Sequence, residues 1–161
     1  MSAAPDMPQP SLPYSQYRLI HDIYVFLDAG DTIALGEFQL TPSQYTLIML
    51  LDAGDGQNLI RLAERMLVAR STITRLIDQL EGMGLVGRVN DPDDRRALRV
   101  ALTPVGERLR EGAYIAHEDS LAQRFSVLSA DEQEQLHVLL RRLRDSLLAG
   151  ISQPQTIDVK R

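Results

Sequence analysis

Apolar residues recur at spacings of three and four along most of the chain, a pattern that predicts a series of amphipathic helices. The first helix is predicted from Tyr14 to Leu35. One face of it would carry these residues: Tyr17, Ile20, Tyr24 and Leu27. Such a stripe is typical of a helix that packs along one side.

A capping signal marks the start of the second helix. Thr41 can cap it, Pro42 suits its first position, and Gln44 completes a capping box. We expect the glycines that follow Leu51 to end it. Asn58 is a suitable cap for a short third helix. The residues of this helix predicted to face inward are Leu59, Leu62, Ala63 and Met66.

A tight break over residues 67–69 separates the third helix from a fourth, which is predicted from Arg70 to Gly82. Its apolar residues follow the spacing i, i+3, i+4, i+7: Ile73, Leu76, Ile77 and Leu80. Polar side chains occupy its other faces. Ala69, just before the helix, is a poor N-cap because its side chain has no hydrogen-bond acceptor.

After Gly84 the pattern changes to two short runs of β-forming residues, Leu85–Asn90 and Ala97–Leu102. The sequence Asp91-Pro92-Asp93-Asp94 between them is a strong turn signal. We therefore predict a two-stranded hairpin with a charged tip.

Two long helices complete the pattern. Thr103, followed by proline, opens the fifth helix, in which Gly106 is a weak point. Ser129 and Glu132 form a capping box for the sixth, which ends near Gly150. The sixth helix carries a stripe of leucines: Leu136, Leu139, Leu140, Leu143 and Leu147.

Composition narrows the class of protein. With 161 residues, 44% of them hydrophobic and 24% charged, the chain fits one globular domain. It contains no cysteine, which excludes disulfides, thiolate metal sites and thiol-based switches. No apolar run is long enough to span a membrane and no secretory signal is visible, so we expect a cytoplasmic protein with no membrane contact. Residues 1–13 and 151–161 are predicted to be a flexible arm and a flexible tail.

Charge is distributed unevenly along the chain, whose formal net charge is −5. The segment Arg61–Arg110 holds 10 arginines against 7 acidic residues, which leaves 7 basic and 15 acidic residues elsewhere. A protein of this balance does not coat nucleic acid through bulk charge. The middle third is therefore the candidate anion-binding region.

The order of the elements is that of a winged helix-turn-helix: two helices joined by a tight break, then a hairpin. The second helix of the pair, Arg70–Gly82, has an apolar face to hold it and polar and cationic side chains for the major groove. Arg95 and Arg96, just after the turn, would reach the backbone or the minor groove.

An ordered set of motifs resembles the MarR family of transcriptional regulators over roughly Tyr17–Gly150. The motifs are Leu62-Ala63-Glu64-Arg65, the run from Ser71 to Glu81, Gly84-Leu85-Val86, Arg88, Asp91-Pro92-Asp93-Asp94-Arg95-Arg96 and Leu102-Thr103-Pro104-Val105-Gly106. The resemblance implies a mainly helical homodimer held by residues 14–36 and 103–150, with residues 41–102 as the winged helix-turn-helix lobe. It also implies that two lobes read a pseudo-palindromic operator in double-stranded DNA.

The candidate DNA-binding residues lie on the fourth helix and the hairpin: Arg70, Ser71, Thr72, Thr74, Arg75, Arg88, Asp94, Arg95 and Arg96. In the family's wing element, which falls here on Asp94 and Arg96, the aspartate orients the arginine that enters the minor groove. The alternative for Arg75 is a solvated arginine paired with Asp78 or Gln79. Arg95 and Arg96 could equally be neutralised in an exposed turn by neighbouring aspartates.

The resemblance also implies a pocket for a small aromatic or phenolic anion between the dimer helices and the DNA lobe. The candidate residues are Tyr17, His21, Tyr24 and Tyr114, with Tyr14 nearby. Their alternative role is core or interface packing. The three histidines lie on three different predicted helices, so no metal site and no cofactor is expected.

Three function classes are thus weighed. The first is a DNA-binding regulator, a repressor released by its effector. The second is a winged-helix module that binds proteins and not DNA, which the net acidic charge supports. An enzyme is disfavoured, because the sequence has no phosphate loop, nucleophile elbow, metal cluster or convergent pair of carboxylates.

Overall fold

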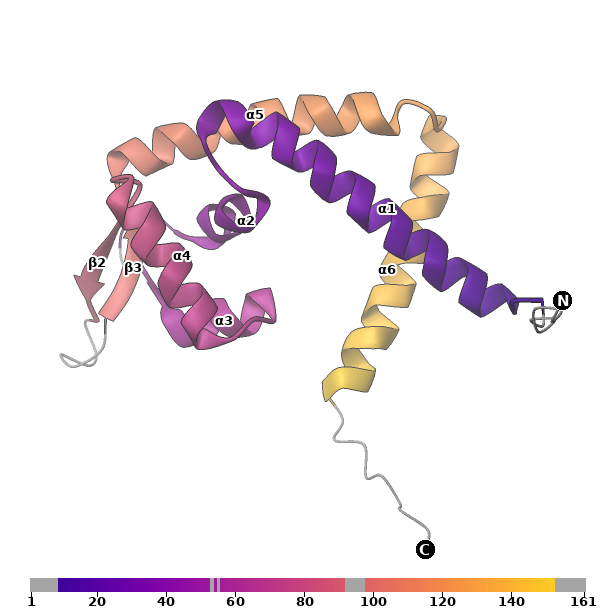
Figure 1. The fold of residues 1–161 in the computed structure, drawn as a ribbon, viewed down its shortest axis with the longest axis horizontal. Helices are drawn as coiled ribbons and strands as arrows, with labels where there is room; N and C mark the ends of the chain where they lie inside the picture. Colours follow the sequence, from indigo (N-terminus) through magenta and orange to yellow (C-terminus); the bar gives the residue numbers. More distant parts are fainter. Residues whose placement is uncertain (1–8, 53, 55, 92–97, 153–161) are drawn as a thin grey trace, which may run out of the picture. The chain divides into compact units, whose positions relative to one another are not determined.

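The computed structural model describes residues 9–52, 54, 56–91 and 98–152. Along these residues the elements are α1 (Leu12–Leu35), the short 3-10 helix η1 (Gly36–Phe38), α2 (Pro42–Leu50), β1 (Gln57–Asn58), α3 (Leu59–Met66), α4 (Arg70–Gly82), β2 (Val86–Asn90), β3 (Leu98–Leu102), α5 (Pro104–Phe125) and α6 (Ala130–Ser152) (Figure 1). The predicted fold class, mainly helical with a small β wing, is confirmed. None of the helices in the described ranges is both long and apolar enough to cross a membrane.

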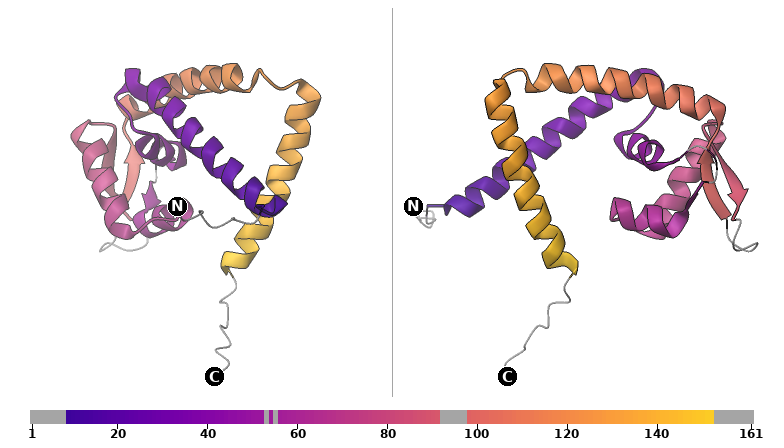
Figure 2. Two further views of the ribbon diagram at one scale, coloured as in Figure 1. Left: turned by 45° about the vertical axis from the view of Figure 1, so that its right-hand side comes forward. Right: turned by 180° about the vertical axis from the view of Figure 1, so that it is seen from behind.

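The chain divides into two compact units, Met1–Ser120 and Leu121–Arg161, and the boundary falls inside α5. In the first unit, α2, α3, α4 and the strands gather into one lobe. Figures 1 and 2 show the C-terminal end of α1 and the N-terminal part of α5 next to this lobe. The second unit holds the end of α5 and the whole of α6.

The core of the lobe is built from the apolar stripes that the sequence predicts. All four stripe residues of α4 are buried, and so are Leu62 and Ala63 of α3. Leu59 and Met66 pack against the same core while partly buried. The largest fully buried side chains are Leu35, Leu47, Ile48, Leu51, Leu62, Ile73, Ile77, Leu80 and Val100.

Capping interactions form where the sequence predicts them. The Gln44 N–H donates to the Thr41 hydroxyl at 3.3 Å, and the Thr41 N–H donates to the Gln44 side-chain oxygen at 2.9 Å. The Ile60 N–H donates to the Asn58 side chain at 2.8 Å. Ala69 precedes α4 without a side-chain cap, as predicted. A capping box therefore fixes the start of α2, and an asparagine N-cap fixes the start of α3.

Several features differ from the prediction. Helix α1 begins at Leu12 and not at Tyr14, because the Ser11 hydroxyl caps it by accepting the Tyr14 N–H. Helix α2 ends at Leu50, before the glycines, because buried Leu51 adopts an extended backbone. A third strand, β1, pairs antiparallel with β3, so the sheet has the order β1-β3-β2 and is not a two-stranded hairpin.

The start of α5 is fastened to the turn between α4 and β2. The Thr103 hydroxyl donates to the Gly84 carbonyl at 2.7 Å and accepts the Gly106 N–H at 3.0 Å. The Thr103 N–H donates to the Leu85 carbonyl at 3.0 Å. A Cβ at position 106 would lie only 2.0 Å from the same carbonyl oxygen. Gly106 is thus a close-packing position.

Candidate nucleic-acid interface

The turn between α3 and α4 sets the angle between these two helices. Leu67 adopts the left-handed conformation with φ 52°, and the Val68 N–H donates to the Ala63 carbonyl at 3.1 Å. The four apolar residues of α4 then hold it against the core. These two features present the polar side of α4 to solvent, as a helix-turn-helix requires.

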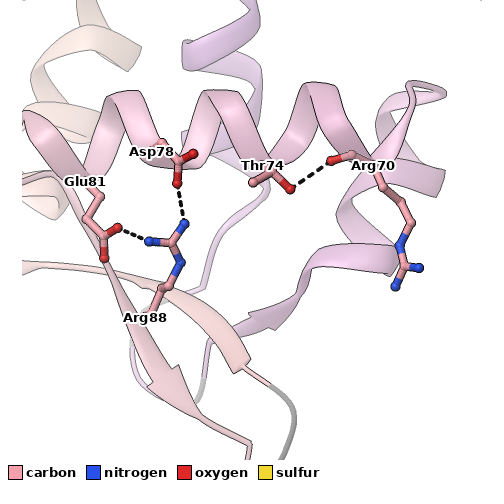
Figure 3. A network of polar contacts seen from close by, with 5 residues as sticks. All are labelled: Arg70, Thr74, Asp78, Glu81 and Arg88. Atoms are coloured by element: carbon pink, nitrogen blue, oxygen red, sulfur yellow. Dashed lines mark hydrogen bonds and ion pairs between the residues drawn. The ribbon is translucent and has the colours of Figure 1, made fainter.

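The predicted contact residues of α4 lie together on its outer side. Arg70, Ser71, Thr74 and Arg75 are exposed, and Thr72 is half-buried. The Thr74 hydroxyl donates to the Arg70 carbonyl at 3.0 Å (Figure 3). This backbone bond leaves the hydroxyl oxygen as an acceptor toward solvent.

The guanidinium groups of α4 are available for an anion. In the described part of the chain, neither Arg70 nor Arg75 forms an ion pair or a side-chain hydrogen bond. The alternative partners weighed for Arg75 are engaged elsewhere, because Asp78 binds Arg88 and Gln79 accepts a bond from Gln44 at 3.2 Å. The structure therefore favours a free cation at position 75.

Arg88 of β2 is bound to two carboxylates of α4. Its two terminal nitrogens reach Asp78 and Glu81, which are one helical turn apart (Figure 3). The hydrogen bond that Arg88 donates to Asp78 is the main cause that raises the pKa of Arg88 above its ordinary value. This clamp joins the wing to the recognition helix. The geometry favours a positioning role for Arg88 over the predicted contact with DNA.

The wing sheet is held at its far end by a second ion pair. Strands β2 and β3 pair in register from Val86 opposite Leu102 to Asn90 opposite Leu98. Arg99 of β3 donates to both carboxylate oxygens of Asp91, the residue that follows β2, at 2.7 and 3.1 Å. Three predicted wing residues, Asp94, Arg95 and Arg96, lie outside the described residues, and their roles stay predictions.

The predicted effector residues do not share one hollow within the described chain. Tyr17 and His21 line a shallow depression on α1 together with Tyr14. Tyr114 lines a different one, between α2 and α5, whose lining includes Met49, Arg108 and Arg110. Tyr24 is exposed on α1 and lines neither of these two hollows.

A junction of α1, α2 and α5 was missed by sequence reasoning. The ring of His117 meets the buried ring of Tyr45 edge-on, with centroids 4.9 Å apart, and its Nε2 lies 3.0 Å from the Asp31 carboxylate. Burial raises the pKa of the Tyr45 hydroxyl. Nothing in the sequence pairs Asp31 with His117, which are 86 positions apart.

The described residues contain no group of three or more His, Cys, Asp or Glu side chains that could hold a metal ion. The lobe carries a helix face on which the Arg70 and Arg75 side chains have no partner among the described residues, beside a sheet that two ion pairs hold in place.

Comparison with known proteins agrees with this geometry. The MarR family model matches residues 40–98. The chain is 35% identical over 106 residues to YkoM of Bacillus subtilis, named an uncharacterized HTH-type transcriptional regulator, and the match covers 66% of this chain and 69% of that protein.

Two solved structures show the same fold. A MarR variant from E. coli in complex with operator DNA has a TM-score of 0.73 and 26% identity, and the match covers 82% of this chain and 94% of that one. CouR from Rhodococcus jostii RHA1, bound to p-coumaroyl-CoA, has a TM-score of 0.73 and 26% identity, over 93% of this chain and 100% of that one.

The comparisons favour DNA binding over the alternative of a protein-interaction module, and regulation over enzymatic activity. The order of α3, α4 and the wing sheet is that of the winged helix-turn-helix. The chain belongs to the MarR family of DNA-binding transcriptional regulators.

Proposed function

We propose that this regulator is a homodimeric repressor that binds a pseudo-palindromic operator and releases it when an aromatic or phenolic anion binds. The observation that carries the DNA contact is the outer face of α4, where Arg75 is exposed and unpaired within the described chain. In this proposal residues 41–102 form the lobe that enters DNA. Arg70, Ser71, Thr72, Thr74 and Arg75 contact base edges and phosphates.

Exposed apolar faces support the dimer. On α1, Tyr17, Ile20 and Tyr24 are exposed, and on α6 so are Leu139 and Leu143. Exposed apolar side chains that recur along one helix mark an interaction site, and no helix within the described ranges is long and apolar enough to cross a membrane. We assign these faces, within residues 14–36 and 103–150, to contact with a second copy of the chain. Two lobes would then read half-sites about 34 Å apart.

The hollow between α2 and α5 is the proposed effector site. Its lining combines the ring of Tyr114 with two arginines, Arg108 and Arg110, and two glutamates, Glu107 and Glu111. Arg110 donates to the Leu51 carbonyl at 2.8 Å, so the Arg108 guanidinium and the Tyr114 ring are the groups that would take an aromatic anion. The ligand of CouR contains a phenolic acyl group, which supports this class of effector. An effector must bind the DNA-free form more tightly, because a ligand with equal affinity for both forms changes no equilibrium.

A gel-shift titration against the region upstream of the protein's own gene tests the function. We expect a shift that an unrelated duplex does not remove, and a loss of the shift when p-coumarate is added to saturation. Unchanged operator affinity with p-coumarate would reject that ligand. Absence of any sequence preference would favour the protein-interaction module.

Replacing Arg75 with alanine should weaken operator binding by about 1–3 kcal/mol and flatten the dependence on salt. The reason is that the variant loses a free guanidinium from the outer face of α4. Fluorescence anisotropy at several salt concentrations measures both quantities. Arg75→Lys serves as the matched variant, because it keeps the charge and loses the bidentate fork. Unchanged affinity for Arg75→Ala would show that Arg75 does not contact DNA.

Breaking the ion pairs of Arg88 with Asp78 and Glu81 should reduce the preference for operator over unrelated DNA by about tenfold. The reason is that a displaced wing would lose about one good base contact. The fold should persist, because exposed ion pairs contribute only about 0–1 kcal/mol. The informative variant removes both carboxylates, Asp78→Asn with Glu81→Gln. If Arg88 has a positioning role, this variant and Arg88→Gln should both lose preference for operator over unrelated DNA. A phosphate role for Arg88 predicts the opposite, a gain in affinity from a freed arginine.

A further inference from the structure

A second cationic feature of the lobe lies outside α4. It is a surface hollow where α3, β1 and the far ends of the wing strands meet. We call it the arginine hollow. The residues that matter here are Arg61 and Arg65 of α3, Gln57 of β1, and Asp91 and Arg99 of the wing.

The two arginines of α3 point the same way without acidic partners. Arg61 and Arg65 are four residues apart, so they lie on one helical face, and both are exposed. In the described part of the chain the Arg61 side chain forms no hydrogen bond or ion pair. Arg65 reaches only the Gln57 side-chain oxygen, at 3.5 Å. Like charges at this spacing disfavour a helix, and a bound anion would offset their repulsion.

The carboxylates that line the hollow are already engaged. Asp91 is held by two nitrogens of Arg99, and Asp52 accepts the Gln57 side-chain N–H at 2.7 Å. The Gln57 amide is neutral, so Asp52 keeps its charge. With three arginines against two aspartates, the described lining still has a net positive charge, which is available to a ligand from solution.

The location of the hollow suggests the source of that ligand. Asn58 of β1 pairs with Arg99, at the end of the sheet where Asn90 pairs with Leu98. The opposite end, where Val86 pairs with Leu102, leads into α5. The hollow therefore adjoins the wing-tip end of the sheet. Its edge is β1, whereas the β2 edge is the one clamped to α4 by Arg88.

We propose that the arginine hollow binds a phosphate group through Arg61 and Arg65, and that this group is a backbone phosphate of the operator on the outer side of the wing. The inference rests on the proposed function. Two guanidinium groups offer paired N–H donors that match a phosphate, and a phosphate contact adds affinity without reading sequence. The hollow thus extends the DNA contact beyond the groove that α4 enters.

The double variant Arg61→Gln with Arg65→Gln tests the proposal in the full-length chain. We expect affinity for operator and for an unrelated duplex to fall by the same factor, about tenfold or more. The slope of log affinity against log salt should fall by about one to two. Arg142→Gln on α6, an exposed arginine outside the lobe, is the matched control and should change neither. Thermal melting of each variant verifies that it is folded.

A second experiment with pyrophosphate tests whether the phosphate group bound in the arginine hollow belongs to DNA or to a free phosphate compound. If the double variant keeps both DNA affinities, and pyrophosphate raises the melting temperature of the original chain but not of the variant, the hollow takes a free phosphate ligand and the DNA assignment is overturned. If neither DNA affinity nor the pyrophosphate effect changes, the phosphate site itself is overturned. If the original chain shows no DNA binding at all, the proposed function fails. The effect of pyrophosphate on the melting temperature then still shows whether the hollow binds phosphate.

Discussion

Replacing Gly106 with alanine should lower the free energy of unfolding by about 3 kcal/mol, because the added methyl group has no space. Its Cβ would lie 2.0 Å from the Leu85 carbonyl oxygen and 2.9 Å from the carbonyl carbon. That carbonyl cannot withdraw without breaking its bond from the Thr103 N–H. Urea denaturation followed by circular dichroism measures the loss.

Gly82→Ala is the matched control for this substitution. Gly82 is the last residue of α4, and a Cβ there would meet nothing within 4 Å. We expect its stability to be unchanged or raised by up to about 1 kcal/mol. Equal stability of Gly106→Ala and the original chain would mean that α5 does not approach the α4–β2 turn as closely as described.

Replacing Leu143 with glutamate should convert the proposed dimer into monomers and weaken operator binding by about 100-fold or more, the usual effect of losing one of two linked contacts. Leu143 is 43% exposed in the single chain, so the substitution leaves the chain's own core intact. In a dimer packed along the α6 stripe, the same change buries an unpaired charge. Sedimentation velocity gives the mass, and a gel shift gives the affinity.

The control for this prediction lies on the opposite face of the same helix. Arg141→Glu also introduces an acidic side chain, at a position that helical geometry places away from the leucine stripe. This variant should remain a dimer. A Leu143→Glu protein that sediments as a dimer would remove α6 from the proposed interface.

Local signals in the sequence predict much of this fold. The four apolar residues of α4 repeat at helical spacing, and all four are buried because each turn returns them to the core. The Thr41–Gln44 capping box forms as predicted because both of its bonds lie within four residues. The polar outer side of α4 follows from the same periodicity. The choice of its five candidate residues as DNA contacts came from the family resemblance and stays a prediction.

Features that depend on distant pairs were not visible in the sequence. Strand β1 has only two residues, too few for a period, and forms only because β3 offers it an edge. Arg88 could be identified as a wing cation, but its partners on α4 emerge only when the sheet packs. The contact of His117 with Asp31 joins α5 to α1, and no local pattern in either helix predicts this pairing.

The fastening of α5 at Thr103 has a mechanical consequence. The end of α4, the start of β2 and the start of α5 share the Gly84–Leu85 turn as an anchor. The Arg88 clamp joins α4 to β2 a few residues further on. We therefore expect α4 and the wing sheet to move together with the start of α5. A displacement of the start of α5 would change the orientation of α4 and the wing sheet together, without distorting either of them.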